Sequence, residues 1–253
     1  MSAGERGKKR FGLCLMIVCL TVLGLTGCSF MKKSSEIESG DVSSGSVVMM
    51  VGGEQVRYSE VLAYCYFLKC QYENSFGKEL WDYKISENET IGDQAKQEIV
   101  NMITQLKVIN AVAQEQGISL SADEQDEALR QAEDLHRNAS AEDKKKYLLS
   151  VQEISEIYQE NALADKMFYV ATDRADTNVS EEEARQAVLD AQNDRDGSQA
   201  SSDGREPGED EINQAKEQII RQRQSDMFIE EYNKWLQDQH VDINQAFWND
   251  FSL

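Results

Sequence analysis

The chain of 253 residues contains one proline, two histidines and five cysteines. An all-β sandwich or a loop-rich enzyme uses proline and glycine at many turns, so one proline and 15 glycines predict long helices with few corners. Basic residues are also scarce, since 26 Lys and Arg stand against 46 Asp and Glu, for a net charge of −20. A surface of this sign repels a polyanion, which argues against a duplex nucleic-acid binder. The 8% aromatic content and the regular apolar spacing favour a packed, mostly α-helical protein over full disorder.

The N-terminus has the layout of a secretory signal. Four basic residues between positions 6 and 10 precede an uncharged stretch from Phe11 to Leu25, which is shorter than the roughly 20 residues of a membrane span. The following Leu25-Thr26-Gly27-Cys28 resembles a bacterial lipobox, in which the cysteine becomes the lipid-modified N-terminus. A chance cysteine after an ordinary signal anchor is the alternative. We expect lipidation at Cys28, and removal of residues 1–27 would change the net charge from −20 to −23.

The segment that follows is rich in serine and glycine and predicts a flexible tether over residues 28–46. After signal removal, Cys65 and Cys70 are the only cysteines left besides Cys28. They lie five positions apart on one predicted helix, so their side chains diverge by about 140° and do not suit a disulfide. We expect both to be small apolar core residues, with a redox or metal pair as the alternative.

The rest of the chain predicts a short β-hairpin and then helices. Val47–Val51 and Glu54–Arg57 flank a Gly-Gly pair, which supplies the positive φ values of a tight turn. Ser59 is expected to cap a densely apolar helix that runs to about Asn74. Ser121 and Glu124 form a capping box, and Ser180 begins a second one. Further helices are predicted at 94–116, 121–137, 143–149, 151–172, 180–192 and 211–239, with an irregular stretch at 81–91, a polar linker at 193–210 and a short strand at 241–243.

Catalytic patterns are scarce. Neither His136 nor His240 has a partner at metal-ligand spacing, and the chain has no nucleophile elbow, P-loop or dinucleotide fingerprint. Asp194 to Gly197 resembles part of a calcium loop, but the frame fails at its first and twelfth positions. Glutamates 181–183 suit a helix N-terminus better than acid/base chemistry. The sequence therefore predicts no catalytic residue, no metal and no cofactor.

Aromatic and methionine side chains are frequent on otherwise polar helices. We expect most of them to be core, but adjacent pairs such as Tyr66-Phe67 and Phe168-Tyr169 cannot share one helix face. Some could line a promiscuous apolar groove, for which flexible Met and amphipathic Tyr are suited. The candidate binding residues are Tyr64, Phe67, Trp81, Tyr83, Met167, Phe168 and Tyr169.

The order of these motifs resembles the chaperone module of the SurA and PrsA foldases. The matching segments are the hairpin and helix start at 48–60, Ala113 to Ser121, Val179 to Glu183, and the final Val241 to Asn244. The similarity covers nearly all of residues 47–244. It implies a mostly α fold in which the last helix packs back onto the N-terminal helices and a C-terminal strand joins the hairpin. Family members with isomerase activity carry a parvulin domain before the last helix, but this chain has only residues 193–210 there, too few for a domain.

The resemblance implies a lipid-anchored, extracytoplasmic chaperone that holds unfolded secreted polypeptides, without an isomerase domain. A peptidyl-prolyl isomerase and a solute-binding lipoprotein are the alternatives, although the alternating βα pattern of the latter is missing. The expected partners are unfolded secreted proteins and, through the lipid, the membrane. Nucleic acid is not an expected partner, and the oligomeric state stays open, a homodimer included. The expected organisation is a signal peptide (1–27), a tether (28–46), a helical module (47–192), a linker (193–210), and a helix and strand that complete the module (211–253).

Overall fold

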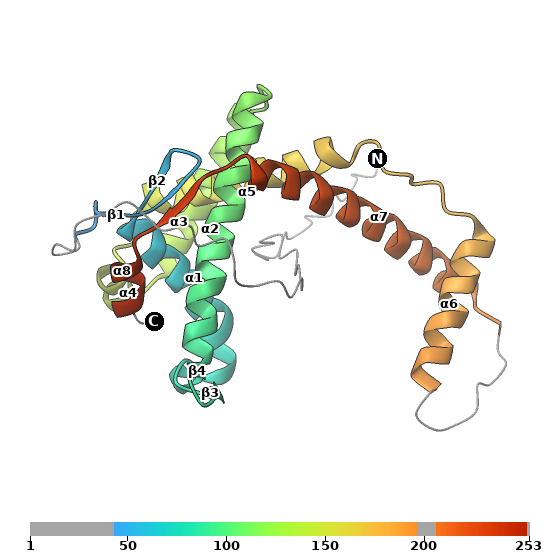
Figure 1. The fold of residues 1–253 in the computed structure, drawn as a ribbon, viewed down its shortest axis with the longest axis horizontal. Helices are drawn as coiled ribbons and strands as arrows, with labels where there is room; N and C mark the ends of the chain where they lie inside the picture. Colours follow the sequence, from blue (N-terminus) through green and yellow to red (C-terminus); the bar gives the residue numbers. More distant parts are fainter. Residues whose placement is uncertain (1–42, 197–205, 252–253) are drawn as a thin grey trace, which may run out of the picture.

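The computed structural model describes residues 43–196 and 206–251, and this part is mostly α-helical, as predicted (Figure 1). Cys28 and the predicted signal peptide lie outside the described residues. Within the described part, no helix is long and apolar enough to cross a membrane. The elements in chain order are β1 (Val47–Val51), β2 (Glu54–Arg57), α1 (Tyr58–Phe76), the 3-10 helix η1 (Lys78–Leu80), β3 (Lys84–Ser86), β4 (Glu89–Thr90), α2 (Ile91–Glu115), α3 (Ala122–Asn138), α4 (Ala141–Lys146), α5 (Val151–Thr172), α6 (Glu181–Asp196), α7 (Glu209–Gln237), β5 (Val241–Ile243) and α8 (Gln245–Asp250).

A three-stranded antiparallel sheet joins the two ends of the described chain. Its strand order is β2-β1-β5, with Met50 opposite Gln55 on one side and Asp242 on the other. The turn uses Gly52 and Gly53 at φ of 58° and 95°, which other residues rarely adopt. The predicted hairpin and the C-terminal strand that joins it are both confirmed.

The ordered body begins slightly before the predicted boundary at Val47. The backbone carbonyls of Ser44 and Ser46 accept hydrogen bonds from the amides of Ser59 and Tyr58. These bonds satisfy amide groups at the start of α1, which have no partners within the helix itself. The last residues of the predicted tether therefore belong to the folded part.

The main hydrophobic core is shared by the three-stranded sheet and helices α1 to α3, α5 and α8, which together we call the body. Helix α1 runs through its centre. Every residue from Val61 to Leu68 is buried, because neighbouring elements cover the helix on all sides. The prediction that Ser59 caps this helix is wrong. β2 runs directly into α1, so Arg57 is the N-cap and Ser59 already lies in the first turn. The Ser59 hydroxyl instead donates to Glu153 Oε2 at 2.9 Å.

The stretch predicted as irregular, residues 81–91, contains a small hairpin of β3 and β4 that closes the far end of α1 and α2. α2 begins at Ile91, three residues earlier than predicted. The cause is a capping box in which Asp93 N–H donates to Thr90 Oγ1 and Thr90 N–H donates to Asp93 Oδ2. We call residues 76–90 the arm tip.

Helix α3 packs along α5. Its predicted capping box is confirmed, because Ser121 N–H donates to Glu124 Oε2 at 2.6 Å and Glu124 N–H donates to Ser121 Oγ at 3.3 Å. The short helix predicted at 143–149 begins earlier, as α4, where the Ser140 hydroxyl caps it.

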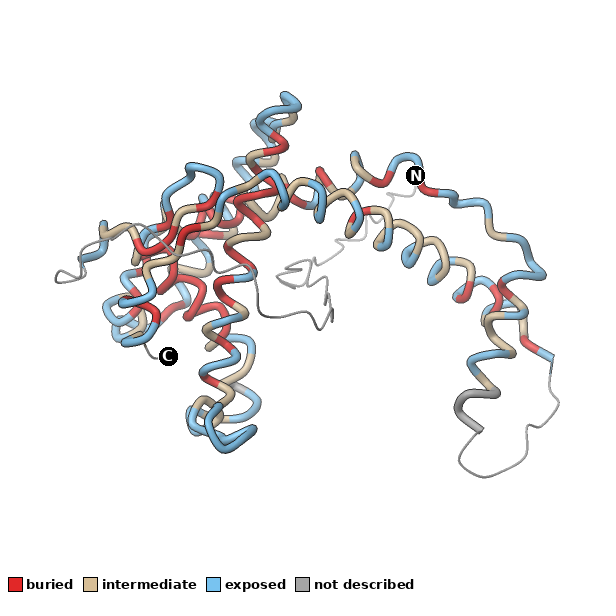
Figure 2. The backbone as a smooth tube through the Cα atoms, in the orientation of Figure 1, coloured by how far each residue is buried: buried red, intermediate tan, exposed pale blue. Residues whose placement is uncertain are grey.

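Helices α6 and α7 pack together around a small core of their own. Ala184, Ile212 and Ala215 are buried there, separately from the main core. The linker predicted at 193–210 is shorter, since α6 continues to Asp196 and α7 already begins at Glu209. α7 then crosses to the body, where it packs on α2 and α5. The buried residues concentrate in the body, and α7 forms a bridge from it to α6 (Figures 1 and 2).

Candidate functional site

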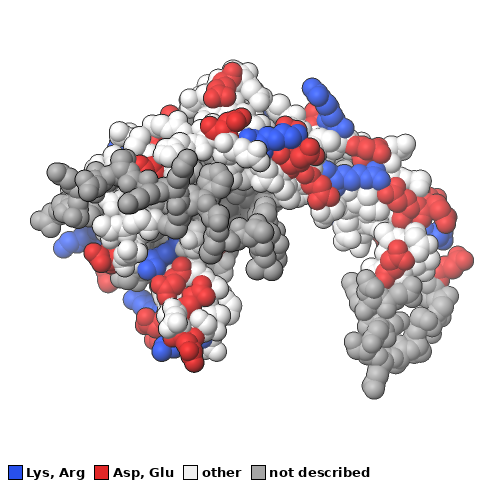
Figure 3. Space-filling model, in the orientation of Figure 1, with Lys and Arg blue, Asp and Glu red and all other residues white. Residues whose placement is uncertain are grey.

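The molecule has the shape of an arch. One arm is formed by the lower parts of α1 and α2 with the arm tip, the other by α6, and both extend to the same side of α7 (Figure 1). Figure 3 shows the space-filling surface hollowed beneath α7. Along the bridge, Lys and Arg alternate with Asp and Glu, as in the ion pairs of Arg221 with Glu217 and of Lys234 with Glu230.

Large apolar side chains are exposed at the arm tip. The residues Phe76, Tyr83 and Ile85 are 66%, 67% and 46% exposed. Tyr169 and Val170, at the end of α5, are 69% and 46% exposed. Single exposed apolar residues are ordinary on a protein surface, but these three lie within ten positions at the arm tip, where they can bind another apolar surface; we call them the apolar patch.

The bridge adds a further apolar stripe. Ile220 and Met227 are half-buried on α7 and belong to neither hydrophobic cluster. They lie seven positions apart, which is close to two helical turns, so they are on the same face of the helix. Methionine is flexible and polarisable, which suits contact with varied apolar partners.

The seven predicted binding residues do not come together in one groove. Tyr64, Phe67 and Met167 are 1%, 6% and 0% exposed, so in this structure they are core residues with no surface to offer a partner. The dense apolar run of α1 and the stripe of α5 face neighbouring helices, which explains their burial.

Trp81 and Phe168 are half-buried and serve packing. Trp81 Nε1–H donates to Glu73 Oε1 at 2.7 Å, and its ring meets Tyr72 edge-on. Phe168 packs against Phe228 of α7. Of the predicted residues, only Tyr83 and Tyr169 are well exposed. The sequence analysis missed Phe76 and Ile85, although both stand in the largely polar stretch that follows the apolar run of α1.

A second feature is a polar cleft of about 680 Å³ between the turn of β1 and β2, α1, α2, α5 and the loop after α2. Five carboxylates, five carboxamides and two cations line it. The carboxylates belong to Glu54, Glu60, Glu153, Glu156 and Glu160, and the cations to Arg57 and Lys107.

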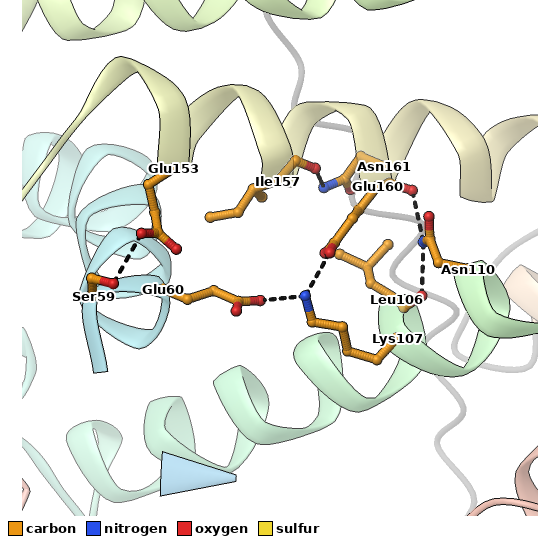
Figure 4. Close-up of polar contacts among 9 residues, drawn as sticks. All are labelled: Ser59, Glu60, Leu106, Lys107, Asn110, Glu153, Ile157, Glu160 and Asn161. Carbon is orange, nitrogen blue, oxygen red and sulfur yellow. Dashed lines mark hydrogen bonds and ion pairs between the residues drawn. The ribbon is translucent and has the colours of Figure 1, made fainter. Parts of the chain in front are cut away.

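Lys107 lies between two of these carboxylates (Figure 4). Its Nζ is 2.9 Å from Glu60 Oε1 and 2.5 Å from Glu160 Oε1, so one ammonium joins α1, α2 and α5. The side chains of Lys107 and Glu60 are 10% and 8% exposed. The neighbouring Asn110 Nδ2 donates to the carbonyls of Leu106 and Glu160 at 2.8 and 3.1 Å. We call Glu60, Lys107 and Glu160 the buried triad.

Burial changes the acidity of the triad. It raises the pKa of Glu60 to about 7, although Lys107 acts in the opposite direction. The pKa of Glu160 is raised for the same reason. Burial by itself lowers the pKa of Lys107, but Glu160 and Glu60 together hold that pKa above its ordinary value. The triad therefore keeps its lysine charged and favours a proton on its carboxylates.

The sequence analysis did not single out the triad. Its signal was present, because Lys107 and Asn110 stand on the apolar stripe of α2 that also contains Ile103 and Leu106. A charged residue in such a stripe needs a buried partner.

Side chains suited to nucleophilic or metal chemistry are dispersed. Within residues 43–196 and 206–251, no group of three His, Cys, Asp or Glu residues is placed to hold a metal ion. Neither cysteine of α1 forms a disulfide bond within the described residues. Cys65 is buried as predicted, and burial raises the pKa of its thiol to about 12. Cys70 is exposed, so its predicted place in the core is wrong.

Comparison with known proteins gives one match. The family model described as the SurA-like N-terminal domain matches residues 6–171, about two thirds of the chain. No curated protein and no solved structure matches it. The match spans the hairpin and helices α1 to α5 almost completely, and these elements hold the arm tip and the buried triad. The chain therefore belongs to the SurA-like N-terminal domain family, a chaperone-type family of extracytoplasmic proteins.

Proposed function

We propose that this protein is a lipid-anchored chaperone that holds unfolded secreted polypeptides outside the cytoplasm, without an isomerase domain. The observation that carries the proposal is the exposed apolar patch of Phe76, Tyr83 and Ile85 at the end of one arm of the arch. An unfolded chain exposes apolar side chains, and burying them against such a patch yields about 25 cal/mol for each Å² removed from water.

The other features of the arch support the same activity. Tyr169 and Val170 on α5, and Ile220 and Met227 on α7, give further apolar contact points. The net charge of −20 favours solubility of a complex whose client is prone to aggregate.

We propose the following organisation for this activity. Residues 1–27 are the signal peptide, Cys28 carries the lipid, and a tether leads to the module. The module comprises residues 44–196 together with 209–251, because β5 and α7 return to the body built by the first segment. An unfolded segment would be held beneath α7, close to the membrane from which secreted chains emerge.

A holding assay with a matched control tests this proposal. The triple variant Phe76→Ser, Tyr83→Ser, Ile85→Ser removes the patch, whereas Leu129→Ser removes an exposed apolar residue of α3, 42% exposed, away from it. At stoichiometric amounts the wild type and the α3 variant should suppress aggregation of a chemically unfolded client, and the triple variant should suppress it several-fold less. Equal suppression by all three proteins would show that the arm tip does not bind the client. If the wild type does not suppress aggregation, the proposed holding activity is wrong.

A further inference from the structure

The buried triad has an unbalanced charge. With all three groups ionised, two carboxylates share one ammonium, so a net charge of −1 remains at the junction of α1, α2 and α5. Glu160 Oε2 adds to the imbalance, because it is buried and has no hydrogen-bond partner among the described residues. An uncompensated charge in a buried site is costly, and binding one proton removes it.

The surroundings of the triad increase this imbalance. α5 also presents Glu153 and Glu156, and β2 presents Glu54, with Arg57 as the additional cation of the cleft. Tyr64, one turn beyond Glu60 on α1, has a buried hydroxyl without a hydrogen-bond partner among the described residues. The charged and titratable groups around Glu60 and Glu160 are thus Glu54 and Arg57 of β2, Tyr64 of α1, Lys107 of α2, and Glu153 and Glu156 of α5.

The polar cleft gives the triad a route to solvent. Glu60, Lys107 and Glu160 all line the cleft, so a proton can reach a carboxylate without global unfolding. Water can likewise enter when the charge is unbalanced. The same three residues hold three helices together, and α7 packs on two of these helices, α2 and α5.

We propose that the buried triad is a proton-operated switch. With one proton shared by Glu60 and Glu160, the junction of α1, α2 and α5 is electrically balanced and closed. When the proton leaves, the remaining negative charge draws water in from the cleft and loosens the contact of α5 with α1 and α2. This property is independent of the holding activity proposed above.

The direction of the pH effect follows from proton binding. Glu60 has a pKa of about 7 in the folded protein against 4.5 as its ordinary value, so between these values the folded state binds more protons than the unfolded state. Stability attributable to Glu60 is therefore fully present below about pH 4.5, declines as the pH rises from there and is lost above about 7. The two carboxylates titrate as a pair, and one proton serves both.

Urea unfolding of the purified protein between pH 5 and 8.5, followed by tryptophan fluorescence, tests the switch. The unfolding equilibrium constant of the wild type should rise with pH, and the part due to the triad should be on the order of 100-fold. Glu60→Gln, which imitates the protonated side chain, should remove this part. Glu156→Gln changes a carboxylate of the same cleft outside the triad and should leave it in place. The proposal is overturned if Glu60→Gln keeps the pH dependence of the wild type. It is also overturned if Glu156→Gln loses this dependence to the same extent as Glu60→Gln.

Two measurements on the wild type keep the test decisive if Glu60→Gln does not fold. A carbon-13 titration of the glutamate carboxyls should show one group that titrates near pH 7. Amide exchange of residues 153–160, corrected for the intrinsic effect of pH, should be several-fold faster at pH 8 than at pH 5.5. If every glutamate carboxyl titrates below pH 5.5, or the corrected exchange does not change, the switch is excluded.

Discussion

The ring of Phe228 on α7 packs against the ring of Phe168 on α5, with centroids 5.2 Å apart and an interplanar angle of 50°. Phe228 is 1% exposed. Its ring also meets Trp235 edge-on at 5.8 Å. This contact fastens the bridge to the body, and the position of the second arm depends on it.

Phe228→Ala should destabilise the protein by about 3–5 kcal/mol, because a fully buried aromatic side chain is replaced by a cavity. Urea unfolding measures this loss. Tyr169→Ala is the control, since Tyr169 neighbours Phe168 in sequence but is 69% exposed, and its replacement should cost less than about 0.5 kcal/mol. Similar losses for the two variants would show that Phe228 does not fasten α7.

Arg223 of α7 holds the loop between α5 and α6. Its guanidinium donates to the carbonyl of Asp176 at 3.1 Å and to Glu183 Oε1 at 2.6 Å. Arg223→Ala should increase amide exchange several-fold at residues 176–184, while the body remains protected. Arg221→Ala, which removes an exposed pair with Glu217 on the same helix, should leave this exchange unchanged. The role of Arg223 is disproved if the loop exchanges at the wild-type rate in both variants.

Asn110 joins α2 to α5, because its amide donates to the carbonyls of Leu106 and Glu160. Asn110→Ala should cost about 1–3 kcal/mol of unfolding free energy, since one buried and one partly buried hydrogen bond are lost. The matched variant Asn101→Ala changes an exposed asparagine of α2 and should cost less than about 0.5 kcal/mol. Chemical unfolding at one pH compares them, and equal costs would contradict the structural role of Asn110.

Peptidyl-prolyl isomerase activity should be absent. Only residues 197–208 separate α6 from α7, too few to form a catalytic domain. Uncatalysed isomerisation of an X-Pro peptide takes tens to hundreds of seconds at 25 °C. In a cis/trans assay, adding the purified protein should leave this time unchanged. A rate that increases in proportion to protein concentration would require an active site elsewhere in the chain.

Lipid attachment at Cys28 predicts incorporation of a labelled fatty acid and a membrane-bound protein in the cell. Cys28→Ser should abolish the label, whereas Cys14→Ser, within the predicted signal, should retain it. If Cys28→Ser remains in the membrane and the wild type carries no label, the apolar stretch of residues 11–25 acts as a signal anchor instead.

Several elements could be predicted from local patterns. Gly52 and Gly53 identified the hairpin, and the Ser121 and Glu124 capping box identified the start of α3, because both depend on interactions within a few residues. The predicted pairing of a C-terminal strand with the hairpin came from the family resemblance. The hairpin of β3 and β4 was missed because all three residues of β3 are exposed, so no buried face imposes an alternation of polar and apolar residues.

The candidate binding residues show the limit of such patterns. Tyr64 and Tyr83 are the same residue type, yet one is 1% and the other 67% exposed. The difference arises because α1 is covered on all sides by elements distant in sequence, whereas Tyr83 lies just before β3, at the end of the arm.

The sequence by itself determined the helical fold class, the scarcity of catalytic motifs and the first residues of several helices. These features depend on composition, capping and turn geometry, which act over short distances along the chain. Only the tertiary structure decided which aromatic side chains are core and which are surface. It also brought Glu60, Lys107 and Glu160 together from three helices, although the first two lie 47 positions apart in the sequence and the last two 53. Contacts between residues so distant in sequence depend on how whole helices pack. Two buried carboxylates can share one ammonium only after the three helices have packed together.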